Sequence, residues 1–203
     1  MRYKAKHGLL IQEILNSFGR RGMWVSPYIT YCETDEPVEY NSRELQDIEF
    51  RELQLDDAGM IAAMEENAIP EDKIEKRFAD GGIAFGAFYR GRLVAIIWAN
   101  LNYISGLGDS PPIRKLESDE AYLYGTFTLR EYRGRGIIPA LRAPFRRRLG
   151  EIGRHKCYSV NMYFNRAARR MKEKFGARQL ELRLSIALFG RIRKDFLLKI
   201  LSR

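Results

Sequence analysis

Three arginines and two glycines stand within the first seven residues of the stretch REYRGRGIIPALR, Arg130 to Arg142. Gly134 and Gly136 allow the backbone to bend and a ligand to approach main-chain amides closely. Arg133 and Arg135 add charged hydrogen-bond donors. A loop that leaves a strand and opens a helix also presents the positive end of the helix dipole. The stretch therefore predicts a phosphate-binding loop, although a glycine-arginine run alone is also compatible with a plain surface turn.

The net charge of +9 is unevenly distributed along the 203 residues. Between Arg130 and Lys174, fourteen Lys or Arg residues face three acidic residues, whereas residues 1–129 carry a net charge of −7. Such a local positive field favours a polyanionic partner. A phosphate-bearing cofactor, a nucleic acid and an anionic membrane surface all meet this description, and composition alone does not choose among them.

Several other classes of protein are disfavoured. Cys32 and Cys157 have no neighbouring metal ligands, so neither a disulfide framework nor a zinc site is expected. His7 and His155 are the only histidines, and neither stands near a nucleophile, which disfavours a histidine-dependent hydrolase. No apolar run approaches the roughly 20 residues of a membrane span. The N-terminus lacks a signal-like core, so we expect a cytoplasmic protein.

The elements that must position the loop follow from periodicity and turn residues. Residues 1–47 are predicted to form an extension with an amphipathic helix, whose apolar residues end before Gly19, followed by an extended segment. Residues 48–203 are predicted to form the main domain. Its expected strands are 48–54, 83–89, 93–101, 121–130, 156–164 and 178–189, and its expected helices are 55–68, 70–82, 137–153 and 165–177.

Three parts of this pattern need comment. Residues 102–120 form a connection longer than is typical, which is often a sign of function. Pro144 is expected to kink or shorten the helix that follows the glycine-arginine loop. The last segment, residues 191–203, fits either a final strand or a basic amphipathic helix.

In this order of elements the chain resembles the GNAT superfamily of acyl-coenzyme A (acyl-CoA) dependent N-acyltransferases. The family's cofactor motif is Arg or Gln, two residues, Gly, one residue, then Gly or Ala; here Arg133, Gly136 and Ile138 occupy the three positions, and Ile138 departs from the pattern. A second match lies in NRAARRMKEKFGA, which begins at Asn165. Lys172 stands where many members carry a tyrosine that protonates the departing thiolate.

The resemblance implies an α/β fold with a mixed, mostly antiparallel, splayed central sheet flanked by helices. It also implies that acetyl-CoA, or another acyl-CoA, is the cofactor and that no metal is required. Its pyrophosphate would bind the loop and its pantetheine the preceding strand. The residues that would bind the cofactor are Phe127, Thr128, Arg133, Gly134, Arg135, Gly136, Ile137, Ile138 and Asn165.

The chemistry requires a neutral attacking amine and a proton for the coenzyme A thiolate. Glu120, Tyr122 and Tyr124 are candidates for the base, because they lie on or just before the strand that enters the loop. Lys172, or one of the tyrosines Tyr158 and Tyr163, is a candidate for the group that serves the thiolate. Each also has a structural interpretation, as packing residue or solvated charge.

The acceptor is expected to be a small-molecule amine, with an amino sugar as one option, reached past Trp98 and Tyr103. Two alternatives stay open: a nucleic-acid binder that uses the arginines between Arg142 and Lys156, and a membrane-surface protein whose basic C-terminal segment lies on anionic lipid. Either would bind coenzyme A without turnover or not at all. Nucleic acid is not the expected partner, while peripheral contact with the inner face of the membrane and a homodimer stay open.

Overall fold

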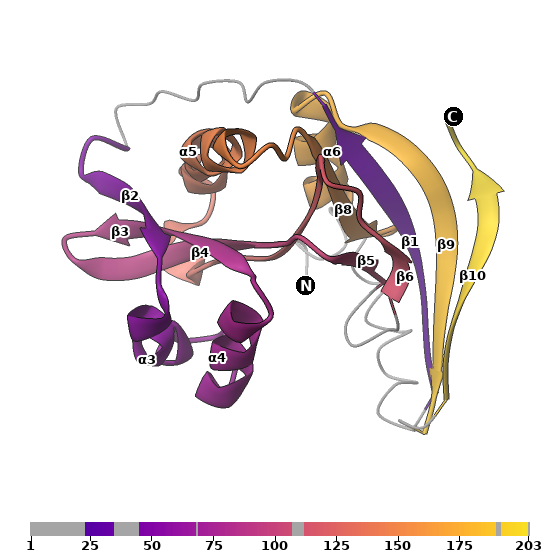
Figure 1. Cartoon of the computed structure of the whole chain (residues 1–203), viewed down its shortest axis with the longest axis horizontal. Helices are drawn as coiled ribbons and strands as arrows, with labels where there is room; N and C mark the ends of the chain where they lie inside the picture. Colours follow the sequence, from indigo (N-terminus) through magenta and orange to yellow (C-terminus); the bar gives the residue numbers. More distant parts are fainter. Residues whose placement is uncertain (1–22, 35–44, 68, 107–111, 190–191, 203) are drawn as a thin grey trace. The chain divides into compact units, whose positions relative to one another are not determined.

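The structure is a computed structural model that describes residues 23–34, 45–67, 69–106, 112–189 and 192–202 (Figure 1). The chain divides into two compact units. Unit 1 comprises Met1–Asp35, Asn102–Glu117 and Lys156–Arg203, and unit 2 comprises Glu36–Leu101 and Ser118–His155. The helix predicted before Gly19 lies outside the described residues.

Unit 2 contains four antiparallel strands in the order β7-β4-β3-β2. They are β2 (Ile48–Leu53), β3 (Ile83–Tyr89), β4 (Arg92–Asn100) and β7 (Glu120–Thr128). Arg90 and Gly91 join β3 to β4 with φ values of 50° and 79°. Two successive positive φ angles are typical of the tight turns that match the twist of a hairpin. The two strands predicted at residues 83–89 and 93–101 are therefore confirmed, and they form a hairpin.

Helices cover both faces of this sheet (Figure 1). The short helices η2 (Leu55–Asp57) and α3 (Ala58–Ala62), together with α4 (Glu71–Ala79), lie on one face, and α5 (Ile137–Glu151) lies on the other. Successive side chains of a strand point to opposite faces. Phe85 of β3 accordingly packs on Phe145 of α5, with ring centroids 5.3 Å apart, while Trp98 of β4 packs on Phe78 of α4 at 4.8 Å.

Unit 1 contains four more antiparallel strands, in the order β10-β9-β1-β8. They are β1 (Met23–Glu33), β8 (Lys156–Met162), β9 (Arg178–Leu188) and β10 (Ile192–Ile200), and α6 (Arg166–Lys174) connects β8 to β9. β1 pairs with both β8 and β9, so the strand of the predicted N-terminal extension is an integral part of this sheet. A domain boundary near residue 47 stays a prediction.

Three local features differ from the simplest sequence interpretation. Residues 102–120 contain a small hairpin, β5 (Tyr103–Ser105) with β6 (Pro112–Lys115), which the sequence analysis missed. The C-terminal segment is the strand β10, so the amphipathic-helix interpretation was wrong. α5 continues through Pro144 to Glu151, and the proline therefore does not end the helix. Within the described ranges, no helix has the length and apolar composition needed to cross a bilayer.

Candidate functional site: an amide-lined loop between β7 and α5

Main-chain hydrogen bonds fix the connection from β7 to α5. The amide of Leu129 donates to the carbonyl of Val94 at 2.9 Å, which fixes the start of the loop to β4. The short helix η3 (Arg130–Tyr132) follows, and the amide of Tyr132 donates to the carbonyl of Leu129 at 2.9 Å. The loop therefore leaves the sheet at a defined position.

Two glycines then reverse the chain into the helix. Gly134 has a φ of 82° and Gly136 a φ of 78°, and Gly136 is the N-cap residue of α5. Other residue types adopt this left-handed region at a cost, so the glycines set the path of the loop. Both positions were predicted as phosphate-loop glycines.

Five consecutive amides of this turn are unpaired with main chain. Within the described part of the chain, no backbone carbonyl accepts a hydrogen bond from Gly134, Arg135, Gly136, Ile137 or Ile138, and the first such bond of the helix runs from Ala140 to the carbonyl of Gly136. The first turn of α5 contains no acidic residue that would neutralise the helix dipole. Free amides at a helix N-terminus form an anion-binding arrangement.

Two of the loop's arginines, Arg133 and Arg135, form hydrogen bonds that stabilise it. Nε of Arg133 donates to the carbonyl oxygen of Thr128 at 2.9 Å, and its Nη2 lies 3.4 Å from Oε2 of Glu66. Nη2 of Arg135 donates to the carbonyl oxygen of Glu131 at 3.0 Å. Both guanidinium groups therefore stabilise the turn, and a direct contact with a phosphate remains a prediction for each.

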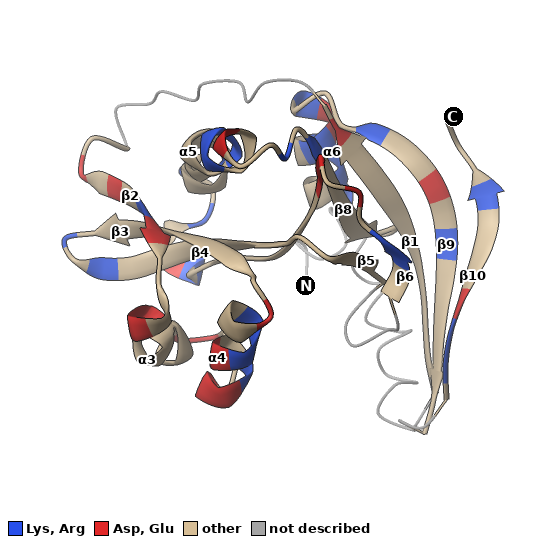
Figure 2. Cartoon of the chain, in the orientation of Figure 1, with Lys and Arg blue, Asp and Glu red and all other residues tan. Residues whose placement is uncertain are grey.

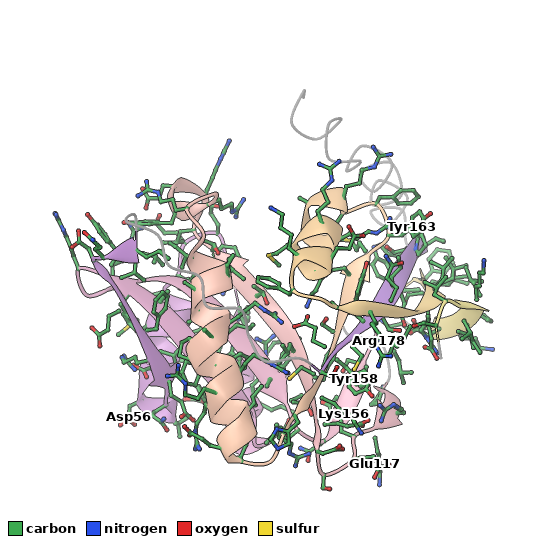
Figure 3. The ribbon with its side chains drawn as sticks, turned by 90° about the horizontal axis from the view of Figure 1, so that it is seen from above. Asp56, Glu117, Lys156, Tyr158, Tyr163 and Arg178 are labelled. Atoms are coloured by element: carbon green, nitrogen blue, oxygen red, sulfur yellow. The ribbon has the colours of Figure 1, made fainter. Side chains whose placement is uncertain are left out.

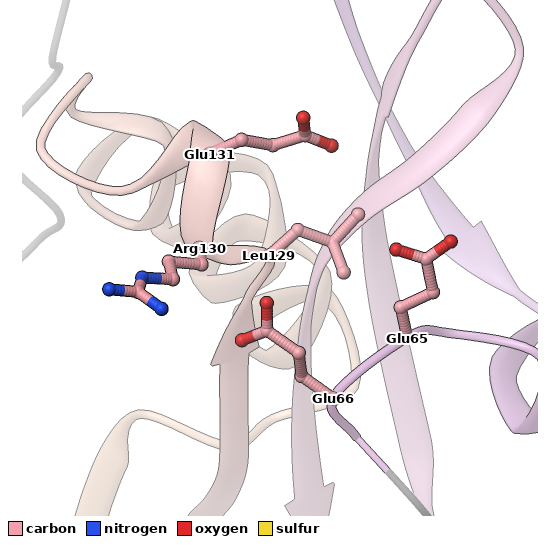
Figure 4. Close-up of a pocket in the computed structure, with 5 residues that line it drawn as sticks. All are labelled: Glu65, Glu66, Leu129, Arg130 and Glu131. Atoms are coloured by element: carbon pink, nitrogen blue, oxygen red, sulfur yellow. The ribbon is translucent and has the colours of Figure 1, made fainter.

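A pocket of about 490 Å³ lies beside the loop (Figure 4). Its lining includes the carboxylates of Glu65, Glu66 and Glu131. Arg92, on β4, forms ion pairs with Glu131 at 2.8 Å and with Glu65 at 3.5 Å. The lining also includes Arg130, so this pocket presents both signs of charge, whereas the row of amides presents donors alone and is the candidate anion site.

The strand that enters the loop contains a β-bulge. Ile96 of β4 is paired with Phe127, whereas Trp98 is paired with Tyr124, so Gly125 and Thr126 of β7 face a single residue of β4. A bulge bends its strand and leaves one residue outside the regular ladder. Phe127 and Thr128, predicted to contact the pantetheine, lie between this bulge and the loop.

The three candidates for a base lie at the start of β7. Glu120 is buried, and its main-chain carbonyl accepts a hydrogen bond from Nη1 of Arg154 at 2.9 Å. Tyr122 is buried and stacks on Tyr124, with centroids 5.8 Å apart and rings 2° from parallel. Burial, reinforced by the neighbouring Tyr124, raises the pKa of the Tyr122 phenol. The phenol therefore stays protonated, so Tyr122 is not available as a base, and the raised pKa also makes it a weaker proton donor than an ordinary tyrosine.

Trp98 and Tyr103, predicted to line the path of the acceptor, lie in different units. Trp98 is fully buried in unit 2, where Phe78, Tyr124 and the guanidinium of Arg77 surround its ring. Tyr103 begins β5 in unit 1 and is paired with Lys115. The sequence analysis did not single out Arg77, whose only sequence signal is a charge within a helix.

Lys172 lies on α6 in unit 1 and is buried. Its Nζ is 3.1 Å from Oε1 of Glu33 on β1 and 2.6 Å from Oγ of Ser159 on β8. These contacts make it the cation of an internal ion pair. Neither partner had a recognisable signal in the sequence, because both are distant along the chain.

Asn165 is the N-cap residue of α6, and its Oδ1 accepts a hydrogen bond from the amide of Ala168 at 3.2 Å. Tyr158 and Tyr163, the other candidates for serving the thiolate, are also in unit 1 (Figure 3). Arg114 stacks over the ring of Tyr158 at 4.8 Å, and Arg169 over Tyr163 at 5.0 Å. Asn165 therefore caps α6, whereas a cofactor contact is still a prediction.

Lys and Arg residues lie on α5 and α6, which follow the loop in sequence (Figure 2), and several of those on α5 are buried or paired. Arg142 and Arg146 of α5 are buried, and Arg148 pairs with Glu52 at 2.9 Å. In the residues that the structure describes, no group of three or more His, Cys, Asp and Glu side chains could hold a metal ion.

Comparison with known proteins supports the fold and the family. A model of the acetyltransferase (GNAT) family matches residues 32–177, more than half of the chain. Among curated proteins, none gives a significant match.

Solved structures share the fold at low identity. A functionally unknown conserved protein from Staphylococcus epidermidis has a TM-score of 0.58 at 12% identity, covering 87% of this chain and 67% of its own. A GCN5-related N-acetyltransferase-like protein from Streptococcus suis has a TM-score of 0.54 at 14% identity, covering 89% and 68%. A Drosophila protein has a TM-score of 0.58 at 12% identity, covering 90% and 58%.

This chain thus spans between 58% and 68% of the length of those three structures. Three observations indicate the same family. They are the mixed α/β architecture with antiparallel sheet pairing, the strand-loop-helix unit with its free amides, and the match to the family model. The chain belongs to the acetyltransferase (GNAT) family.

Proposed function

We propose that this protein transfers an acetyl group from acetyl-CoA to the primary amine of a small molecule. The observation that carries the proposal is the row of five free amides, Gly134 to Ile138, at the N-terminus of α5 in a member of this family. They would hold the pyrophosphate of the cofactor. A pyrophosphate bound there gains main-chain hydrogen bonds and the favourable end of the helix dipole.

The remaining cofactor contacts follow the strand order. The main chain of Phe127 and Thr128 would hold the pantetheine, next to the bulge of β7. A contact of Asn165 with the cofactor stays a prediction. Bound acetyl-CoA supplies a thioester whose acyl carbon is open to attack by an amine. An acceptor amine must lose its proton to attack.

Among the side chains of β7, Glu120 and Tyr124 remain the candidates for the base. The raised pKa of Tyr122 keeps its phenol protonated, which removes it from the candidates for the base. Lys172 is bound to Glu33 and Ser159, so we assign it to the structure of unit 1 and leave the proton for the thiolate to a tyrosine or water.

The cofactor site is tested by calorimetric titration with acetyl-CoA. The informative variant is Gly134→Asp, because Gly134 has open space around an added β-carbon and a φ of 82°. Gly153→Asp is a matched control: its φ is 79°, its surroundings are equally open, and it follows the opposite end of α5. Gly136→Asp and Arg133→Ala complete the series.

We expect the wild type and Gly153→Asp to bind acetyl-CoA equally. Gly134→Asp and Gly136→Asp should bind acetyl-CoA at least tenfold more weakly, because each places a carboxylate beside the pyrophosphate. Arg133→Ala should also bind it more weakly, because the loop loses the hydrogen bond from Arg133 to the carbonyl oxygen of Thr128. Equal affinity in all five proteins would remove the loop from the site. Release of free thiol with a panel of amines then reports turnover.

The nucleic-acid alternative has less support. It requires solvated arginines between Arg142 and Lys156, yet several of these are buried or paired within unit 2. The membrane alternative assumed a helical C-terminal segment, which is a strand. Peripheral membrane contact, a homodimer and a cytoplasmic location stay predictions, as does an amino sugar as acceptor.

A further inference from the structure

One cation in unit 2 packs against two aromatic rings. The guanidinium of Arg77, on α4, lies with its Cζ 5.4 Å from the ring centroid of Trp98 and 5.2 Å from that of Tyr124. Both rings belong to the sheet, on β4 and β7. Within the described residues, Arg77 has no acidic partner, in contrast to its helix neighbour Lys76, which pairs with Asp80 at 3.3 Å.

Two nitrogen donors of this cluster are buried and unused. Nη1 of Arg77 and Nε1 of Trp98 each have essentially no exposed area and no hydrogen-bond partner in the part of the chain that the structure describes. Buried donors in native proteins are nearly always paired with protein, water or ligand. A buried, charged donor beside a buried neutral one therefore points to an acceptor group that binds there.

The bulge of β7 places an exposed glycine next to the two donors. Gly125, with a φ of 58°, is exposed, and a β-carbon built on it would lie 3.7 Å from Nη1 of Arg77. The same β-carbon would lie 3.0 Å from Cδ1 of Trp98, the ring carbon bonded to Nε1. The two donors thus lie beneath a surface position where any side chain would occupy the approach.

The chemistry of the donors defines the ligand class. A guanidinium recognises planar carboxylates through charge-assisted hydrogen bonds, and an indole N–H is a donor only. An unpaired, partly desolvated cation favours a full negative charge over a neutral carbonyl. We propose that Arg77 and Trp98 bind a carboxylate of the acceptor, so that the acceptor is an amine that also carries a carboxylate, such as an amino acid.

This inference rests on the proposed acyl transfer and specifies its substrate class. Gly125 precedes Phe127 by two residues on the same strand, a distance of roughly 7 Å at the usual rise of a β-strand. The pantetheine is proposed to bind the main chain of Phe127 and Thr128, and the thioester at its end would then lie near this part of β7. A molecule of the size of an amino acid can therefore place its carboxylate over Gly125 and its amine near the acyl group.

The test compares amino acids with their carboxamides, which keep the amine and lose the negative charge. The readout is the acid-to-amide ratio of kcat/KM for thiol release, measured in the wild type, Arg77→Met, Trp98→Phe and Lys76→Met. Taking each variant's ratio relative to the wild type cancels the intrinsic difference in amine basicity. Lys76→Met is the matched control, because it removes one positive charge from the next position of the same helix.

We expect the ratio to fall at least tenfold in Arg77→Met and several-fold in Trp98→Phe, which retains the ring and loses the N–H. Lys76→Met should leave it unchanged. If Arg77→Met lowers the rates with acid and amide by the same factor, the arginine positions the acyl group or the fold, and the carboxylate proposal is overturned. Normal acetyl-CoA binding in that case would leave the proposed function intact.

A binding measurement decides the question without turnover. Calorimetric titrations use N-acetylated amino acids and their primary amides as probes. At least one carboxylate of the panel should bind the wild type tenfold more tightly than its amide, with the difference lost in Arg77→Met. Equal affinities for acids and amides throughout the panel, or no binding of any acid, would refute the carboxylate site.

Discussion

Nζ of Lys172 lies 3.1 Å from Oε1 of Glu33, and the two side chains are only 7% and 5% exposed. The contact joins α6 to β1, and Ser159 extends it to β8 at 2.6 Å. An ion pair inside a protein contributes little net stability, but the loss of one partner leaves an uncompensated buried charge. Lys172, at the position where many family members carry a tyrosine, therefore links α6 to β1 and β8 within unit 1.

Lys172→Met should lower the free energy of unfolding by about 3 to 5 kcal/mol, because it leaves the carboxylate of Glu33 buried without a cation. Adding Glu33→Gln to that variant should restore a large part of the loss. Urea unfolding followed by circular dichroism measures both. Lys76→Met, which removes an exposed partner of Asp80, should change stability by less than about 1 kcal/mol. A Lys172→Met protein with unchanged stability and no transfer activity would instead identify Lys172 as a catalytic residue.

Asn165 has a confirmed role as helix cap and a predicted role at the cofactor, and two substitutions separate them. Aspartate retains the capping oxygen, whereas alanine removes it. We expect Asn165→Ala to lower stability by about 1 kcal/mol and Asn165→Asp to preserve it. If the side chain also approaches the cofactor, Asn165→Asp should raise the Kd for acetyl-CoA several-fold through its negative charge. Unchanged affinity in Asn165→Asp would confine the residue to capping.

The parts of the fold that sequence reasoning predicted are those with local signals. The β3–β4 hairpin has two β-favouring runs and an Arg-Gly turn at residues 90 and 91, and both helix and strand around the loop follow from residues within a few positions. The small β5–β6 hairpin was missed because its strands are only three and four residues long. A short strand has too few alternations to reveal its period.

The candidate site likewise combines features that have local sequence signals with features that depend on tertiary packing. The free amides of the loop are a property of a contiguous stretch, so its glycines and the absence of proline between Arg130 and Ile138 were sufficient to predict them. The pair of Lys172 and Glu33 spans 139 residues, and the contact of Arg77 with Trp98 depends on how a helix packs on a sheet. Periodicity assigns such residues to elements, but only tertiary packing selects their partners.

Tyr122 offers a test of acid-base roles on β7. Burial raises the pKa of its phenol, so the group is protonated throughout the pH range in which amines become nucleophilic. We expect Tyr122→Phe to keep the rise of kcat/KM with pH and to lower the rate by less than about 100-fold, which is below the usual contribution of a general acid or base, because a phenol of raised pKa is a poor donor and a protonated one is no base. A pH–rate profile with a fixed amine measures this. Disappearance of the rising limb in Tyr122→Phe alone, with Glu120→Gln unaffected, would make Tyr122 the base.

The acid sensitivity of unit 2 should depend on Asp57. Its carboxylate accepts hydrogen bonds from Nη2 and Nη1 of Arg51 at 2.7 and 2.9 Å, and from the amide of Gln54 at 2.8 Å. The hydrogen bonds from Arg51, with that of Gln54, hold the pKa of Asp57 below its ordinary value of 3.8. A carboxyl whose pKa is lower in the folded state stabilises the protein above the unfolded pKa, and this contribution is lost as pH falls through the folded pKa.

The free energy of unfolding of the wild type should therefore decrease on acidification from about pH 5 to about pH 2 more steeply than that of Asp57→Asn, which has no carboxyl to protonate. Asp56→Asn is the matched control, since Asp56 is the exposed neighbour (Figure 3). Urea titrations at each pH provide the slopes. Because Arg51 is partly exposed, the difference should shrink in high salt, which screens the Coulombic part of the pair. Parallel slopes for the wild type and Asp57→Asn at low salt would show that this pair does not govern the acid response.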